Sequence, residues 1–169
     1  MLGCTFCSQT AHPLCKSSMQ INVDDLTGKE IADFLDQHIQ EMRSVSPPES
    51  KHALDIHGLR KPEITFWTIW DEQILSGCGA LKEWDPLHGE IKSMRVAPQY
   101  RRKRVASRLL QHILEEAKAR NYDRLSLETG SMPFFEPARQ LYQKFGFHYC
   151  PPFGHYKEDP NSVFMGLWL

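Results

Sequence analysis

The sequence predicts one mixed α+β domain, in which a central, mostly antiparallel sheet of about seven strands is flanked by about four helices. A chain of 169 residues has the length of one ordinary domain, and its 41% apolar and 24% charged residues are typical of a soluble globular protein. Segments with a two-residue hydrophobic period alternate with segments of helical period. Residues 90–129 show the order strand, helix, strand, which indicates a parallel crossover among hairpins. The apolar runs are only a few residues long, so no membrane span is expected.

The first half of the chain is expected to hold four strands and two helices. The strands occupy segments rich in β-branched and aromatic residues, at 19–24, 64–70, 74–84 and 90–96. Thr27 and Glu30 have the spacing of a capping box, in which Thr27 caps a helix and Glu30 bonds back to the cap amide. Prolines in residues 46–50 end this helix, and a short helix is expected around residues 52–57.

The second half is expected to hold two helices and three strands. A row of apolar residues with helical spacing predicts a helix over residues 102–120: Val105, Leu109, Ile113 and Ala117. A strand follows at 124–129, and a second helix begins at Glu136 and ends at Gly146 in a left-handed cap. The closing strands are expected at 147–150 and 162–169, and the last is apolar enough to lie at the edge of a homodimer.

Residues 1–18 are set apart from the domain at 19–169 and are expected to form a flexible leader. They lack the basic and apolar regions of a signal peptide, and the chain has five cysteines, an odd number, so a reducing, cytoplasmic location is expected. A group of thiols and one imidazole in this leader approaches the spacing of a zinc knuckle: Cys4, Cys7, His12 and Cys15. The last interval is two residues short, so we expect no metal site, with zinc binding as the alternative.

The net charge of −1 conceals a strong asymmetry. One 24-residue stretch, from Ile91 to Leu114, has no acidic residue and seven basic ones: Lys92, Arg95, Arg101, Arg102, Lys103, Arg104 and Arg108. The rest of the chain is therefore acidic on balance. A cationic patch on an acidic body indicates that the patch faces an anionic ligand.

The basic turn lies between the strand at 90–96 and the helix that follows it. Backbone amides at the start of a helix have no intrahelical acceptor and attract anions, and the neighbouring arginines add positive charge. The arrangement predicts a diphosphate-binding turn. The alternative is a solvated basic turn without a ligand.

The same segment resembles the acetyl-CoA motif of the GNAT N-acetyltransferases. Residues 94–106 show a Val-x-Pro strand end followed by a pattern in which Arg101 takes the first place and Ala106 the last. Residues 138–147 resemble the second block of the superfamily, which has Ala, Leu-Tyr and Gly-Phe at fixed spacing. Several phrases also resemble the bacterial YsnE-like N-acetyltransferases. The resemblance spans about residues 20–169 and leaves out the leader.

The resemblance implies that the strand at 90–96 splays from the strand at 124–129 and that acetyl-CoA, as cosubstrate, occupies the gap. Pantetheine would pair with the backbone of Met94 and Val96, and the diphosphate would meet the amides of residues 101–106. The implied cofactor-binding residues are Met94, Arg95, Val96, Arg101, Arg102, Lys103, Arg104, Val105 and Ala106. Arg104 departs from the family pattern, which has glycine there. We expect its side chain to point outward and to add a phosphate contact, although it could also weaken binding.

The resemblance also implies a catalytic set. Tyr142 matches the tyrosine that protonates the departing thiolate. Glu128 and Glu90, on the two strands that flank the gap, are candidates for the base that deprotonates the acceptor amine, and Glu128 is preferred. Alternation places Glu90 on the same face as Lys92 and Met94. Arg95, as a buried cation, is expected to pair with a glutamate or to hold an acidic substrate.

Glu49 and His52, in the loop after the first helix, are the candidates for the acceptor pocket. The predicted function is acetyl transfer from acetyl-CoA to the amine of a small molecule by direct attack on the thioester. A non-catalytic acyl-CoA sensor is the alternative. Nucleic-acid binding through the basic helix start is a third hypothesis, which the acidic remainder of the chain argues against, so no nucleic-acid partner is expected. No membrane partner is expected either, because the apolar runs are short.

Overall fold

The computed structural model describes residues 19–45 and 54–169, which form a sheet of seven strands with helices on both faces. The strands are β1 (Gln20–Val23), β2 (Ile64–Asp71), β3 (Ile74–Asp85), β4 (His88–Val96), β5 (Arg124–Gly130), β6 (His148–Cys150) and β7 (Ser162–Trp168). The α-helices are α1 (Lys29–Val45), α2 (Ile56–Leu59), α3 (Val105–Ala119) and α4 (Glu136–Lys144). Two short 3₁₀ turns complete the described elements, η2 (Pro98–Tyr100) and η3 (Pro133–Phe135).

The strand order is β1-β2-β3-β4-β5-β7-β6. Every neighbouring pair is antiparallel except β4 and β5, which run parallel and are joined through α3. The predicted fold class is therefore confirmed, as is the parallel crossover between the strands on either side of the long helix.

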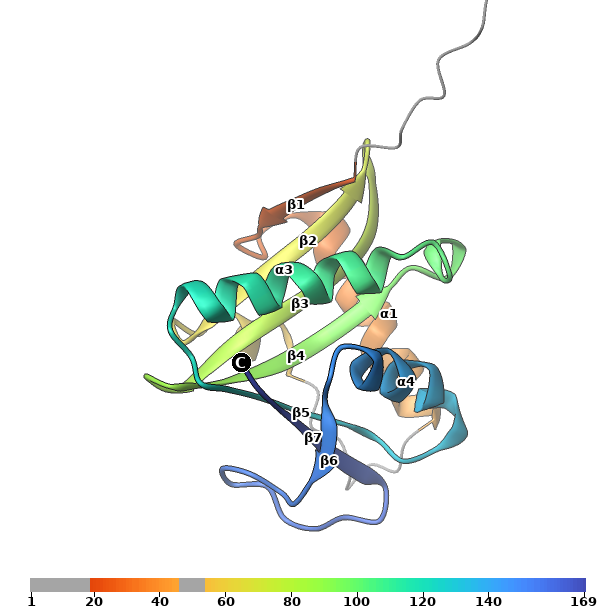
Figure 1. Cartoon of the computed structure of the whole chain (residues 1–169). Helices are drawn as coiled ribbons and strands as arrows, with labels where there is room; N and C mark the ends of the chain where they lie inside the picture. Colours follow the sequence, from red (N-terminus) through yellow and green to blue (C-terminus); the bar gives the residue numbers. More distant parts are fainter. Residues whose placement is uncertain (1–18, 46–53) are drawn as a thin grey trace, which may run out of the picture.

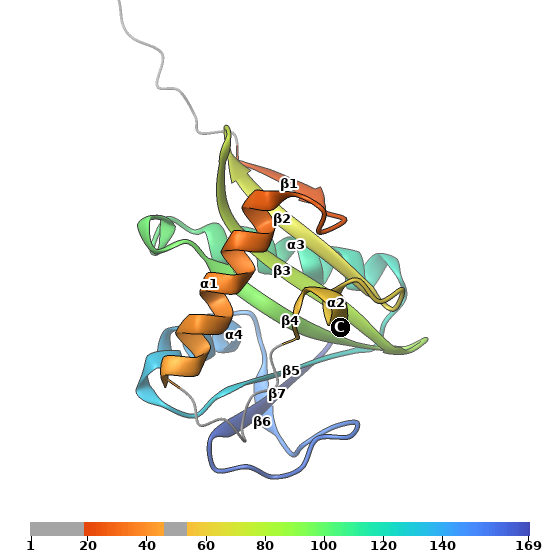
Figure 2. The ribbon, with the colours of Figure 1, turned by 180° about the vertical axis from the view of Figure 1, so that it is seen from behind.

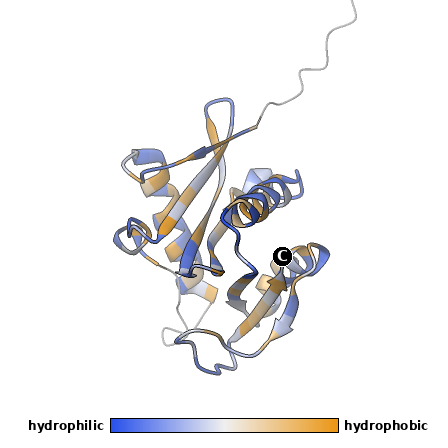
Figure 3. Ribbon diagram, turned by 60° about the vertical axis from the view of Figure 1, so that its left-hand side comes forward, coloured by the Kyte–Doolittle hydropathy of each residue, from blue (hydrophilic) through white to orange (hydrophobic). Residues whose placement is uncertain are grey.

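Helices α3 and α4 lie on one face of the sheet, and α1 and α2 lie on the other (Figures 1 and 2). The core lies mainly between α3 and the sheet, where the predicted apolar row of the helix is fully buried: Val105, Leu109, Ile113 and Ala117. Figure 3 shows hydrophilic and hydrophobic residues on different sides of the helices, as expected for elements that cover a sheet.

The predicted cap of α1 and the predicted start of α2 are wrong. Helix α1 begins at Lys29 without the predicted capping box: the Thr27 hydroxyl donates to Asp25 (2.6 Å), and the Thr27 amide bonds to the same carboxylate (3.0 Å). Asp25 therefore binds the Thr27 amide that was assigned to Glu30, and it also takes up the Thr27 hydroxyl that was to cap the helix. The short helix after it, α2, begins only at Ile56, where Asp55 is the cap.

The C-terminal strand does not form an edge of the sheet, which corrects the predicted placement at a homodimer edge. β7 pairs with β5 on one side and with β6 on the other. The three-residue strand β6 is the edge on that side. The chain returns from β6 to insert its last strand into the sheet, and apolarity alone cannot distinguish an inserted strand from an edge strand.

A bulge in β4 reverses the faces of the residues beyond it. The register with β3 shifts between Cys78 and Ala80, opposite Ser93, which has a left-handed backbone (φ 54°). Lys92 lies on the same face as Arg95, which bonds to α1, whereas Met94 faces α3 and lies against Gly79. Simple alternation, which placed Met94 on the same face as Glu90 and Lys92, is therefore wrong, because a bulge inserts one residue.

Arg95 on β4 holds α1 to the sheet. Its buried guanidinium donates to Glu41 (2.9 Å) and contacts His38 Nδ1 (3.1 Å), and it lies 4.9 Å from the ring centre of Phe34. The glutamate partner expected for this strand cation is thus Glu41. Because Arg95 donates to its ring nitrogen, His38 is held in the neutral form.

We predict that His38 makes stability depend on pH between about 4 and 6.5. Burial, with Arg95 as a second cause, lowers the pKa of His38 from 6.5 to about 4. Between these values the unfolded chain binds a proton that the folded chain does not, so the free energy of unfolding falls as the pH falls through this window. His38→Gln keeps an acceptor for Arg95 and does not titrate.

Urea unfolding at pH 7 and at pH 4.5 is the measurement. The His38→Gln variant should lose less stability between the two values than the parent chain. Equal losses in both proteins would show that His38 does not titrate in this way.

Candidate active site

Strands β4 and β5 pair only over their first four residues. Their register runs from His88–Arg124 to Ile91–Leu127 and then stops within the described chain. Both views show the strands diverging beyond this point, with α4 between their ends (Figures 1 and 2). The last residues of β4 and of β5 therefore face a gap in the sheet, where one side of each backbone has lost its strand partner.

The start of α3 lies at the end of β4. The helix begins at Val105, three residues later than predicted, because Arg102 and Arg104 have left-handed backbones (φ 66° and 64°). Such a backbone costs roughly 1–2 kcal/mol in a residue other than glycine. No side chain caps the helix at Arg104 within the described chain, so the first amides of α3 remain available to an anion.

Position 104 has a left-handed backbone, which glycine adopts without strain, and this explains the glycine of the family pattern. Arg104 adopts this backbone although it carries a side chain. Its side chain is exposed, as are those of Arg101, Arg102 and Lys103. The amides of Arg101 and Lys103 donate to the carbonyl oxygens of Pro98 and Tyr100 (3.3 Å each), so the amides open to an anion are those at the start of α3, with the cations of the turn beside them. This arrangement fits a diphosphate.

The seven-residue basic patch divides into two groups. Lys92 and Arg95 are buried on the α1 face of the sheet and are paired with Glu90 (2.8 Å) and Glu41 (2.9 Å). Glu41 also pairs with Arg101 of the turn (3.0 Å). Only part of the patch therefore faces an external anion, and the rest is neutralised inside the domain.

Glu90 is 1% exposed and lies at the centre of a hydrogen-bonded group. It accepts from Lys92 (2.8 Å), from the Trp84 indole (2.8 Å) and from the Tyr156 hydroxyl (2.7 Å). Three donors and almost complete enclosure leave this carboxylate poorly placed to accept a proton from an incoming amine. Glu128, whose side chain is only partly buried, remains the candidate for the base.

Glu128 lies just past Leu127, the last residue of β5 that pairs with β4, at the start of the gap. It stands opposite Phe164 of β7, and its Oε1 accepts from the Ser162 hydroxyl (2.6 Å). Its side chain is only partly buried. Glu128 also acts electrostatically on two tyrosines, since its charge contributes to raising the pKa of Tyr142 and of Tyr156.

Tyr142 lies on α4 and is 6% exposed. Its ring packs edge-on against Phe147, 5.7 Å away between ring centres. Burial, and secondarily the charge of Glu128, raises the pKa of Tyr142 well above its usual value. The hydroxyl therefore stays protonated and has no hydrogen-bond partner among the described residues, so it can donate to a ligand atom in the gap.

Tyr142 of α4 lies close enough to Glu128 of β5 to interact with it electrostatically, whereas Glu90 lies in its own hydrogen-bonded group. Glu49 and His52, the predicted acceptor-pocket residues, lie outside the described residues, as do the four leader residues considered for zinc. Sequence reasoning missed Tyr156, Ser162 and Glu41. Ser162 follows from the pairing of β5 with β7, whereas Tyr156 reaches Glu90 from an irregular loop with no periodic signal.

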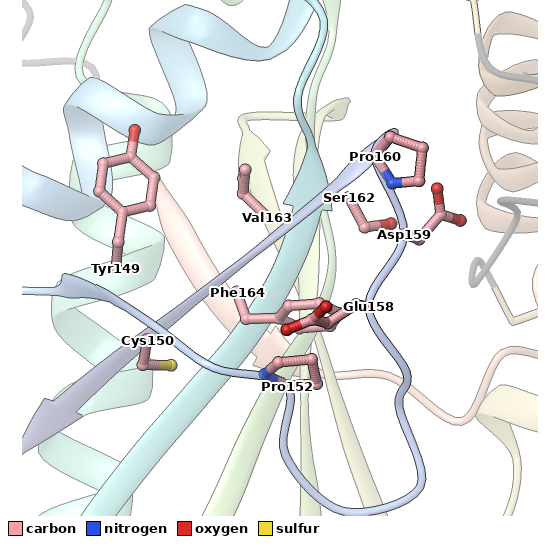
Figure 4. A pocket seen from close by; sticks show the side chains of 9 residues that line it. All are labelled: Tyr149, Cys150, Pro152, Glu158, Asp159, Pro160, Ser162, Val163 and Phe164. Carbon is pink, nitrogen blue, oxygen red and sulfur yellow. The ribbon is translucent and has the colours of Figure 1, made fainter.

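A cavity of about 630 Å³ lies beside this region, between β7, β6 and the loop that joins them (Figure 4). Its lining residues are Tyr149, Cys150, Pro152, Glu158, Asp159, Pro160, Ser162, Val163 and Phe164. Ser162 connects the cavity to Glu128 through its hydroxyl. A small molecule in this cavity would therefore approach the carboxylate from the β7 side.

The described residues contain no group of His, Cys, Asp and Glu side chains that could hold a metal ion. None of their helices combines the length and apolarity needed to cross a bilayer. Cys78 is fully buried, and burial raises the pKa of its thiol to about 12, so it is not a nucleophile at neutral pH.

Three proteins of known name are similar to this chain. The uncharacterized N-acetyltransferase YsnE of Bacillus subtilis is 60% identical, over 87% of this chain and 97% of the relative. The uncharacterized N-acetyltransferase YedL of Escherichia coli is 50% identical, over 88% and 94%. The IAA acetyltransferase of Azospirillum brasilense is 37% identical, over 80% and 86%.

Solved structures share the fold at low sequence identity. An acetyltransferase of Streptococcus agalactiae matches with a TM-score of 0.70 at 19% identity, covering 89% of this chain and 98% of that one. A Bacillus subtilis acetyltransferase in complex with CoA matches with a TM-score of 0.63 at 19% identity, covering 90% and 99%. The model of the acetyltransferase (GNAT) family matches residues 31–147, and this chain therefore belongs to the GNAT family of acetyltransferases.

Proposed function

We propose that this acetyltransferase moves an acetyl group from acetyl-CoA to the amine of a small molecule, by direct attack of the amine on the thioester. The observation that carries the proposal is the end of β4–β5 pairing after Ile91 and Leu127, next to an uncapped helix start and between Glu128 and Tyr142. The relatives named N-acetyltransferases support nitrogen as the acceptor atom. The relative named IAA acetyltransferase supports a small-molecule acceptor.

The cosubstrate would lie along the diverging end of β4. Its pantetheine amides would pair with the backbone of Met94 and Val96, in the direction where β5 no longer supplies partners. The predicted diphosphate site was the amides of residues 101–106; those of Arg101 and Lys103 already donate to carbonyls, so the diphosphate would meet the amides at the start of α3, with the exposed arginines and Lys103 around it. This placement uses the strand edge and the helix start that the fold leaves without partners.

The acceptor amine would approach from the β7 side, through the cavity at Ser162, and lose a proton to Glu128. Its nitrogen would form a bond to the acetyl carbon while the carbon–sulfur bond breaks and the electron pair passes to sulfur. The Tyr142 hydroxyl would then protonate the thiolate. The nitrogen would lose its second proton to solvent as the amide forms, and solvent would return a proton to Tyr142. The hydrogen bond from Ser162 orients the Glu128 carboxylate, and burial keeps Tyr142 protonated for its role as general acid.

Two features suggested the alternative, a non-catalytic acyl-CoA sensor. Arg104 replaces the glycine of the family pattern, and two glutamates competed for the role of base. Membership of an acetyltransferase family favours the enzyme, and the left-handed backbone of Arg104 preserves the shape of the turn. Burial and pairing of two patch cations likewise argue against nucleic acid as a partner, because fewer charges remain for a phosphate backbone.

Replacing Tyr142 by Phe should lower kcat by roughly 10²-fold, because the departing thiolate loses its proton donor. Binding of CoA should change by no more than about twofold, since the hydroxyl is not part of the diphosphate turn. Release of free CoA thiol over a panel of amines measures the first quantity, and calorimetric titration with CoA measures the second.

The matched control is Tyr122→Phe. Tyr122 is equally buried, but its hydroxyl bonds to Glu83 at the other end of the sheet from the gap. This variant should keep its kcat. A Tyr142→Phe variant as active as the parent would remove Tyr142 from the mechanism.

Replacing Glu128 by Gln should produce a defect that depends on pH. The glutamine retains an oxygen to accept from Ser162 but cannot take a proton from an ammonium group. Its activity relative to the parent should therefore rise as the pH approaches the pKa of the acceptor amine, where the amine is already deprotonated.

The measurement is kcat/KM for one amine from pH 6.5 to 9.5 in both proteins. A ratio that stays constant across this range would rule out Glu128 as the base.

A further inference from the structure

Arg139 is a buried cation whose contacts connect α4 to the end of β5. It is 8% exposed. Its Nη1 donates to the carbonyl oxygen of Gly130 (2.6 Å) and to that of Met132 (3.1 Å). Its Nε donates to Glu136 (3.1 Å), and its Nη2 bonds to the same carboxylate. One guanidinium thus ties the last residue of the strand, the turn after it and the start of the helix together.

The strand end at this point is packed closely against the turn. A Cβ at Gly130 would lie 2.2 Å from the ring of Phe135, so the ring of η3 rests directly on the glycine backbone. The Ser131 amide bonds to Asn161 and fixes the same corner from the other side (2.9 Å). The position of the end of β5 relative to α4 is therefore set by packing and by Arg139 together.

The proposed acid and the proposed base lie on the two elements that Arg139 joins. Tyr142 follows Arg139 by three residues on α4, and these two are the buried residues of that helix. Glu128 precedes Gly130 by two residues on β5. The distance between the Tyr142 hydroxyl and the Glu128 carboxylate therefore depends on how α4 packs against the end of β5.

The chemistry of the side chain suits this task. A guanidinium offers donors in several directions within one rigid plane, so it can hold two carbonyls on one side and a carboxylate on another. Glu136 is about half exposed, and bonding to Arg139 is the main cause that lowers its pKa, so it remains a charged partner. An apolar side chain would fill the same space without ordering either carbonyl.

We propose that Arg139 is a positioning residue that sets Tyr142 against the end of β5 and thereby places its hydroxyl on the departing sulfur of CoA. Arg139 does not touch the substrates and acts through Tyr142. The proposal rests on the proposed function, in which Tyr142 is the general acid.

A double-mutant cycle between Arg139→Met and Tyr142→Phe tests this coupling. In the parent background, Arg139→Met should lower kcat by about tenfold, because a small displacement of a catalytic group is costly. In the Tyr142→Phe background the same change should lower kcat by about twofold or less, because the group that Arg139 positions is already gone. KM for acetyl-CoA should stay within about twofold throughout, since the diphosphate turn is untouched.

Arg120→Met is the matched control. Arg120, the residue that caps the C-terminal end of α3, likewise joins two elements. It donates to Glu116 of α3 (2.8 Å) and to Thr65 of β2 (2.9 Å), away from the proposed site. This variant should leave kcat unchanged in both backgrounds. Near-ultraviolet circular dichroism and thermal unfolding establish that each variant is folded, and Arg139→Lys replaces Arg139→Met in the cycle if the latter does not fold.

The outcomes separate the two claims. Equal loss of kcat from Arg139→Met in both backgrounds, or no loss in either, would overturn the positioning role while leaving the acid role of Tyr142 intact. No effect of Tyr142→Phe alone would overturn the acid role and the positioning role together. A loss confined to the background that retains Tyr142 is the result expected from the proposal.

Discussion

The domain is organised around the point where β4 and β5 stop pairing, after Ile91 and Leu127. Before that point the two strands form an ordinary parallel pair, and after it each presents an unpaired backbone edge. The bulge at Ser93 turns β4 within this diverging segment, and the left-handed residues Arg102 and Arg104 turn the chain into α3. Local backbone strain thus collects where the sheet opens, which is where the proposed chemistry takes place.

The basic residues of the segment fall into two groups, one paired inside the domain and one exposed on the turn. Lys92 and Arg95 serve the interior, where Glu90 and Glu41 neutralise them and where Arg95 attaches α1 to the sheet. The exposed cations of the turn lie beside the uncapped start of α3 and suit an external anion. Glu41 links the two groups, since it also pairs with Arg101. The positive charge seen in the sequence is therefore partly structural and partly available to CoA.

Regular periodicity made much of the fold predictable from the sequence. The apolar row of α3, the hairpin of β2 and β3 and the left-handed end of α4 at Gly146 all follow from local patterns. The bulge at Ser93 could not be predicted in this way, because it depends on the register with β3. Tyr142 was predicted from its place in a family-like block, and Glu128 from its place on a strand beside the expected gap. The enclosure of Glu90 could not be predicted, because it needs Trp84 of β3 and Tyr156 from the loop before β7.

A crystal structure of the protein with CoA bound would test the central claim most directly. The account predicts pantetheine alongside Met94 and Val96 in the open end of the β4–β5 pair, with the diphosphate on the amides at the start of α3. The sulfur should lie within hydrogen-bond reach of the Tyr142 hydroxyl. CoA bound away from the diverging strands, or its sulfur remote from Tyr142, would contradict the account.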